Sequence, residues 1–153
     1  MNAFKNRSVF DLTHEVKLSC DMGKLVPFYR QEVLPGDTIK CKTDMLVRIA
    51  PMIAPVMHRM NVFTHYFFVA SRLVHGNWPN FITGGKEGTD TTVIPTVKSP
   101  ASTGYAPGTL WDYMGCPTGV PNLEVLAYPF RAYQLIYNEW YRDQNLIDPV
   151  PLS

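Results

Sequence analysis

The clearest pattern of hydrophobic and polar positions lies in residues 38–49, where the two kinds of residue alternate. One set of alternate positions is mostly apolar: Ile39, Cys41, Thr43, Met45, Val47 and Ile49. The intervening set carries the charges: Thr38, Lys40, Lys42, Asp44, Leu46 and Arg48. A two-residue period is typical of a strand, whereas a helix would scatter these charges around its axis. The pattern predicts a strand with one buried and one solvated face, as in an antiparallel sheet.

Two further segments of the first half are typical of strands. Residues 14–20 alternate in the same way, and residues 61–69 are apolar on both faces, which is expected of a strand buried between layers. Residues 34–37 contain the pair Pro35-Gly36, which predicts a turn because Pro presets φ and Gly adopts positive φ.

The second half of the chain predicts helices and loops. Residues 128–145 place large apolar side chains three and four positions apart, which indicates an amphipathic helix. A short helix capped by Thr109 is predicted at 109–114, and Ser71 is expected to cap a short helical turn. Residues 84–107 are rich in Gly, Thr, Ser and Pro, so we expect a long surface loop or insertion there.

Several stretches, in the same order along the chain, resemble the major capsid proteins of the Microviridae, in particular those of the gokushovirus-like branch. The stretches are RSVFDLTHEVKLSCDMGKLVPFYRQEVLPGDTIK (7–40), APVMHRMNVFTHYFFVASRL (54–73), residues 77–84, YMGCP (113–117) and PFRAYQLIYNEWYRDQNLIDPV (129–150). The resemblance covers most of the chain except residues 85–107. Long, ordered matches of this kind are more specific than any short motif.

The resemblance implies a fold that is mainly β with helical insertions, as part of an eight-stranded viral jelly roll. Since the chain offers only three or four candidate strands, we expect the jelly roll to be incomplete here. Residues 1–153 then form the N-terminal part of one jelly-roll domain. Its divisions are a strand-rich part (7–83), a loop or insertion (84–107) and a helical insertion (108–153).

The function that the resemblance implies is structural. The chain is expected to be a major capsid subunit that self-assembles into a small icosahedral shell around circular single-stranded DNA. The implied partners are copies of itself, the genomic DNA, a scaffolding protein, a DNA-pilot protein and a small DNA-binding protein. The expected location is the virion, assembled in the cytoplasm of a bacterial host. Two alternatives stay open: a non-functional truncated remnant of such a gene, or a free module that binds single-stranded nucleic acid.

Composition and charge change this picture little. An apolar fraction of 46% and an aromatic fraction of 12% are typical of a folded chain. The net charge of +1 does not by itself predict a nucleic-acid or membrane-surface protein. The charge is uneven, however: residues 1–75 hold ten Lys/Arg against six Asp/Glu (+4), and residues 76–153 hold four against seven (−3). The cysteines show no paired spacing, which predicts buried thiols in a reducing compartment.

The search for chemistry finds no zinc-protease, phosphate-loop or nucleophile-elbow motif, so we expect no enzyme, no metal and no cofactor. Nucleic-acid contact is a candidate role for Lys5, Arg7, Lys40, Lys42 and Arg48, with an ordinary solvated surface as the alternative. Subunit contact is a candidate role for Met52, Met57, Met60, Trp78, Phe81, Phe130, Tyr133, Tyr137, Trp140 and Tyr141. Packing inside the subunit is the alternative for this second set.

Overall fold

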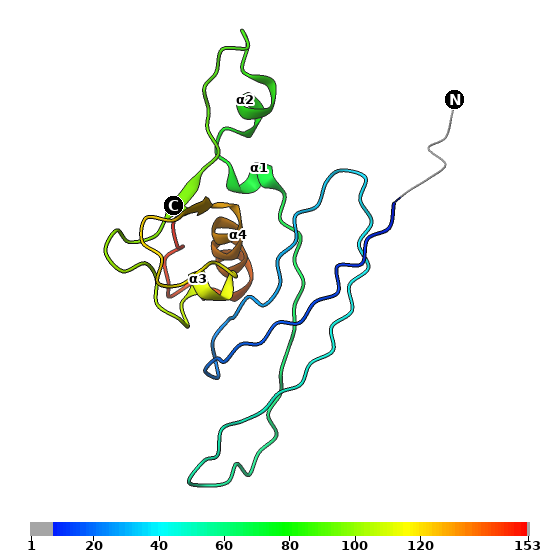
Figure 1. Ribbon diagram of the computed structural model, residues 1–153, viewed down its shortest axis with the longest axis vertical. Helices are drawn as coiled ribbons and strands as arrows, with labels where there is room; N and C mark the ends of the chain where they lie inside the picture. The colour runs from blue at the N-terminus through cyan, green and yellow to red at the C-terminus, as the bar shows by residue number, and fades with distance from the viewer. Residues whose placement is uncertain (1–7, 153) are drawn as a thin grey trace. The chain divides into compact units, whose positions relative to one another are not determined.

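The computed structural model describes residues 8–152, which divide into two compact units. Unit 1 consists of residues 8–30 and 95–130, and unit 2 consists of residues 31–94 and 131–152. The elements in chain order are α1 (Ser71–Val74), α2 (Trp78–Thr83), β1 (Thr96–Lys98), α3 (Leu110–Tyr113), β2 (Glu124–Leu126), α4 (Tyr128–Ile136) and the π-helical turn η1 (Tyr137–Tyr141) (Figure 1).

The three segments predicted to be strands form none within residues 8–152. Residues 14–20, 38–49 and 61–69 run as extended traces (Figure 1), but no hydrogen-bonded ladder joins their main chains in the described part of the chain. A strand requires a paired main chain, and pairing depends on a second segment at the right distance. The two-residue period therefore predicted the extended conformation correctly, but it could not show whether a second strand pairs with the segment.

Part of the predicted apolar set of 38–49 nevertheless lies on one side of the segment. In unit 2 this segment and residues 61–69 face each other across a cavity of about 290 Å³. The cavity is lined by Thr43, Met45, Val47, Val62 and Thr64. The lining residues from 38–49 all belong to the predicted apolar set, and the hydroxyl groups of Thr43 and Tyr66 are hydrogen-bonded across the gap. Alternation thus grouped the side chains that line the cavity, but the prediction of a buried face is wrong within residues 8–152, because every residue of 38–49 is exposed where no further segment covers it.

The sheet of the described chain is an antiparallel pair in unit 1, with Val97 of β1 opposite Val125 of β2. The Thr96 hydroxyl donates a hydrogen bond of 2.6 Å to the Glu124 carboxylate across the pair. Strand β1 lies inside residues 84–107, so the prediction of a continuous loop there is wrong at this point. Three residues are too short to show a period. With one two-stranded sheet, residues 8–152 do not meet the expectation of a mainly β architecture.

The core of unit 1 forms around Trp111 of α3, which is 2% exposed. Its ring stacks on Phe130 at a centroid distance of 5.7 Å and lies 4.8 Å from Tyr105. Its indole N–H donates to the Pro117 carbonyl at 2.8 Å, so the buried polar atom is satisfied. The other buried apolar residues of this core are Met114, Cys116 and Ala127.

The predicted short helices are confirmed, but their caps differ from expectation. Helix α3 begins after Thr109, whose hydroxyl donates to the Ala106 carbonyl (2.8 Å) instead of accepting from the helix. Helix α1 begins at Ser71, with Ala70 in the capping position and no side-chain cap. The predicted turn at 34–37 is also confirmed: the Asp37 N–H donates to the Leu34 carbonyl at 3.1 Å, and Gly36 has φ +94°.

The last helix ends earlier than predicted, at Tyr141 rather than Asn145. Its final turn, η1, is π-helical, with the Arg142 N–H bonded to the Tyr137 carbonyl at 2.8 Å. Arg142 is already extended (φ −71°, ψ 135°). The Asn138 side chain bonds both main-chain groups of Val150, at 2.8 and 2.9 Å. This contact draws the following residues back along the helix, so the helix does not continue.

The three cysteines are free, and their positions correct the expectation of buried thiols. Cys116 is buried in the core of unit 1, whereas Cys20 and Cys41 are exposed. The exposed pair belongs to the extended segments that lack main-chain partners, which leaves their side chains uncovered. Among residues 8–152, no helix has the length and apolar character needed to cross a bilayer.

Candidate interaction surfaces

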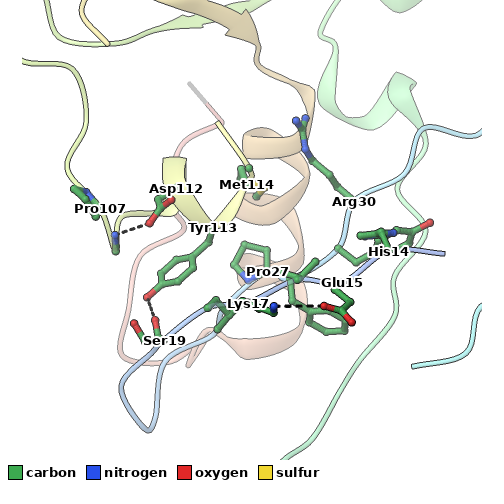
Figure 2. Close-up of a pocket in the computed structure, with 16 residues that line it drawn as sticks. His14, Glu15, Lys17, Ser19, Pro27, Arg30, Pro107, Asp112, Tyr113 and Met114 are labelled. Atoms are coloured by element: carbon green, nitrogen blue, oxygen red, sulfur yellow. Dashed lines mark hydrogen bonds and ion pairs between the residues drawn. The ribbon is translucent and has the colours of Figure 1, made fainter. Parts of the chain in front are cut away.

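Unit 1 contains a groove of about 590 Å³, here called the arm groove. Its walls are two extended arms, residues 14–19 and 27–30, together with residues 107–108 and 112–115 (Figure 2). The chain reverses between the arms at Gly23, whose φ of +80° suits glycine. Across the groove the His14 and Tyr29 rings lie 5.4 Å apart. The arms are therefore held close together without a ladder.

The contacts of Tyr113 attach the first arm to α3. Its hydroxyl donates to the Ser19 carbonyl at 2.9 Å, as Figure 2 shows. The Asp112 carboxylate accepts the Gly108 N–H at 2.8 Å, which fixes the turn before α3. These two hydrogen bonds give the arm groove one ordered wall.

The charged side chains of the arm groove differ in whether they have a partner. Lys17 pairs with Glu15 at 3.6 Å, and both side chains are more than four-fifths exposed, so the pair contributes little stability. Asp112 is occupied by the main chain. Arg30 forms no ion pair with any residue in the range 8–152. Burial raises the pKa of the Cys116 thiol, and the nearby Arg30 charge partly opposes that rise. The groove therefore offers one unpaired cation.

Unit 2 carries a group of aromatic side chains, here called the aromatic step: the exposed Phe63, His65, Phe67 and Trp140, and the half-buried Tyr141. The His65 Nδ1 atom and the Tyr141 hydroxyl are hydrogen-bonded, and their rings stack at 5.9 Å. Phe67 meets Tyr141 edge-on at 6.1 Å and lies 5.9 Å from Trp140. Trp140 remains 71% exposed. The step joins the extended segment 61–69 to the end of the last helix.

The π-helical turn η1 determines how these side chains point. A π turn contains one residue more than an α turn and shifts the following side chains around the axis, often at functional sites. Within η1, Asn138 is 9% exposed and faces the Val150 main chain, whereas Trp140 points outward. Tyr141 turns toward His65. The side chains of this one turn therefore point in three directions: Asn138 inward, Trp140 toward solvent and Tyr141 sideways to His65.

Of the cations predicted to contact nucleic acid, the three within residues 8–152 line neither the arm groove nor the cavity of unit 2. Lys40, Lys42 and Arg48 are exposed. Lys42 pairs with Asp44 at 3.1 Å. Lys5 and Arg7 lie outside the described residues. The described cations form a row along one segment, which suits contact with a flexible backbone better than enclosure of a small anion.

The residues predicted to contact other subunits divide into three groups. Met52, Met57 and Met60 are exposed at 46%, 86% and 43%. Trp78 and Phe81 pack around the buried His75, with centroid distances of 5.0–5.8 Å. On the last helix Phe130 is buried, Tyr133 and Tyr137 are half-buried, and Trp140 and Tyr141 lie in the aromatic step. Burial raises the pKa of Tyr133.

Three members of the aromatic step, Phe63, His65 and Phe67, were not among the predicted site residues. The apolar run at 61–69 predicts a strand buried between layers, with His65 as a core or interface histidine. The same run on an unpaired segment produces an exposed surface instead. Arg30 was not predicted either, because the absence of an ion pair with any described residue is visible only in three dimensions.

A family model described as capsid protein (F protein) matches residues 2–153. Capsid protein VP1 of Chlamydia phage 1 is 43% identical over 154 residues, covering 95% of this chain and 26% of the relative. Capsid protein VP1 of Bdellovibrio phage phiMH2K is also 43% identical, over 146 residues (94% of this chain, 27% of the relative). Capsid protein VP1 of Spiroplasma virus 4 is 34% identical over 150 residues (96% and 27%).

The chain spans about a quarter of the length of these relatives. The matched region nevertheless runs through both units, including the arm groove and the aromatic step. This agreement confirms the resemblance seen in the amino-acid sequence. The chain therefore belongs to the capsid protein (F protein) family of the Microviridae phages.

Proposed function

We propose that this chain acts as a structural capsid subunit that assembles with copies of itself into a small icosahedral shell around circular single-stranded DNA. The observation that carries the proposal is the family match over residues 2–153, together with relatives named capsid protein at 43% identity. The proposed location is the virion, with assembly in the host bacterial cytoplasm. A scaffolding protein, a DNA-pilot protein and a small DNA-binding protein are further proposed partners.

The uncovered surface of residues 8–73 supports an assembling protein. No residue in this range is buried, although it includes many Val, Leu, Ile, Met and Phe side chains. Extended main chain without a ladder also exposes hydrogen-bonding groups that favour pairing with another segment. We infer that residues 14–20, 38–49 and 61–69 become strands of a jelly roll when further polypeptide pairs with them.

Single-stranded DNA is the proposed content of the shell, and the row formed by Lys40, Lys42 and Arg48 is its proposed contact, with Lys5 and Arg7 as further cations. Contacts with phosphates release counterions, so the affinity should fall with salt by a slope of about 0.7 per contact on logarithmic axes. Substituting the three described cations with alanine should reduce that slope by about 2. Lys98→Ala provides a matched control, because Lys98 is an exposed lysine of unit 1. An unchanged slope in the triple variant would remove this contact from the proposal.

The shell itself is tested by peptide mass spectrometry on nuclease-resistant particles, combined with the intact mass of their subunit. Peptides covering 128–142 in a particle subunit support the proposal, whether that subunit has the 17.4 kDa mass of this chain or a larger one. Particles from an expressing host that lack these peptides contradict it. That outcome would favour a gene remnant.

A further inference from the structure

We propose that the aromatic step stacks the unpaired bases of single-stranded DNA, beginning at Phe63. The inference deepens the proposed function and rests on it only for the ligand, because a shell around single-stranded DNA brings unpaired bases to its subunits. It adds contacts between rings and bases to the phosphate contacts proposed for Lys40, Lys42 and Arg48.

Three rings of the aromatic step stand in a row on one side of residues 61–69. The ring centroids of Phe63 and His65 lie 6.5 Å apart, and those of His65 and Phe67 lie 6.3 Å apart. The intervening Val62 and Thr64 line the cavity of unit 2. Successive side chains of an extended segment point to opposite sides, so the row lies on the side away from the cavity.

The spacing of this row suits a stack of bases. Stacked DNA rises about 3.4 Å per nucleotide along each strand, so neighbouring rings of the row are separated by about two such steps. The neighbouring rings are turned by 46° and 81° relative to each other, so they do not stack on one another. Phe63 is 76% exposed, which leaves most of its ring surface for a base to cover.

The other end of the row is held by the last helix. The His65 ring stacks on Tyr141 at 5.9 Å and is hydrogen-bonded to its hydroxyl group. The Phe67 ring lies 5.9 Å from Trp140. Rings that are already held in place lose little conformational freedom when a ligand binds, so the row is preorganised.

The charges around the row favour nucleic acid over a covering layer of polypeptide. Residues 45–86, which lie within unit 2, contain four Lys/Arg and no Asp or Glu, a formal charge of +4. Arg48, Arg59 and Arg72 of this stretch are exposed and form no ion pair within residues 8–152. Each nucleotide brings a negative phosphate, and aromatic side chains among cations are the usual means of binding an unpaired strand.

The acidic residues closest to this stretch limit where the phosphates can run. Glu139 and Asp143 belong to the part of the chain that contacts the far end of the row, where they would repel a phosphate. Asp44 is already paired with a lysine at 3.1 Å. Arg59 precedes Phe63 by four residues at the near end. We therefore expect the phosphates to lie near Arg59 and the first base to stack on Phe63.

Pairing of residues 61–69 with further polypeptide does not compete with this contact. Strand pairing joins main-chain N–H and C=O groups in the plane of a sheet, whereas side chains point out of that plane. The row stays available when this segment becomes a strand. The apolar character of both sides of the segment then has two causes, because the cavity side faces polypeptide and the ring side faces bases.

Fluorescence anisotropy with a single-stranded oligothymidine tests the row. Phe63→Ala should weaken binding roughly 5- to 150-fold at fixed salt, because one stack of a base on an aromatic ring is lost. The slope of affinity against salt should not change, since no phosphate contact is removed. Phe63→Tyr keeps a ring and should keep the affinity. Phe10→Ala is the matched control, because Phe10 is 78% exposed in unit 1, and it should leave the affinity unchanged.

A DNA duplex of the same length separates stacking from charge. Its bases are already paired and stacked, so Phe63→Ala should leave duplex binding unchanged. The proposal is overturned if this variant keeps its affinity for the single strand, if Phe10→Ala lowers that affinity equally, or if duplex binding falls by the same factor. Failed particle assembly with unchanged DNA affinity also overturns it, because polypeptide then covers the row. In each of these cases, particles of the unchanged chain that enclose DNA leave the proposed function standing.

Photo-crosslinking to an oligonucleotide that contains iodinated deoxyuridine gives a second readout in the unchanged chain. Crosslinks form where a base lies against an aromatic ring, so they should map to the peptide that contains residues 61–69. Crosslinks that are absent from this peptide, or that spread evenly over the exposed aromatic residues of both units, overturn the proposal.

Discussion

Replacing Trp111 with alanine should destabilise unit 1 more than any other single truncation of an aromatic residue. The ring is 2% exposed, stacks on Phe130 at 5.7 Å and lies 4.8 Å from Tyr105. Burying about 150–250 Å² at about 25 cal/mol per Å² is worth roughly 4–6 kcal/mol. Truncations of buried tryptophan usually cost about 3–5 kcal/mol. Loss of the indole N–H leaves the Pro117 carbonyl unpaired, which adds about 1 kcal/mol.

Hydrogen–deuterium exchange measured by mass spectrometry checks this prediction. A loss of at least about 3 kcal/mol corresponds to exchange on the order of a hundredfold faster for the main chain of β1 and β2. Trp111→Phe keeps a stacked ring but loses the N–H, so it should cost about 1–2 kcal/mol. Trp140→Ala is the matched control, and since Trp140 is 71% exposed it should change stability by less than about 0.5 kcal/mol. Equal exchange in the Trp111→Ala and Trp140→Ala variants would refute the assignment of this core.

Three other perturbations have defined outcomes. Asn138→Ala should release the segment around Val150, with a local cost of about 1–3 kcal/mol seen as faster proteolysis after residue 142; unchanged cleavage would contradict the anchor. Gly104→Ala should cost more than Gly108→Ala in urea unfolding. Both have positive φ, but only at Gly104 would the new Cβ lie 2.6 Å from main-chain atoms, so equal losses would contradict the close approach. Cys116 should alkylate more slowly than the two exposed cysteines until urea unfolds the chain, because burial raises the pKa of its thiol. Its contribution to stability is present below the ordinary thiol pKa and is lost as pH rises through the raised value; equal alkylation rates in the folded chain would contradict burial.

Local signals in the amino-acid sequence were reliable where the structure is local. The turn at 34–37, the short helix after Thr109 and the long helix from Tyr128 all depend on contacts within a few residues. The alternation in 38–49 grouped the side chains that line the cavity, although the buried face that it predicted is exposed in residues 8–152. The family followed from long ordered stretches, and the family match over residues 2–153 confirms it.

Features that depend on a residue far away in the sequence could not be predicted from local patterns. Strand β1 forms because its three residues meet β2 at Val125, and no pattern of three residues indicates such a partner. The last helix stops at Tyr141 because Asn138 finds Val150 twelve positions away. A periodic pattern cannot show that the contact between Asn138 and Val150 replaces further helical turns.

The amino-acid sequence by itself determined the family, the helical segments and the extended conformation of the first half, because these follow from residue identity and short-range periodicity. Only the tertiary structure decided that Trp111 is core whereas Trp140 is exposed, although both lie on predicted helices. It also decided that Arg30 forms no ion pair within residues 8–152 and that Phe67 belongs to a surface. The physical reason is that burial and pairing are properties of two segments brought together, whereas periodicity is a property of one.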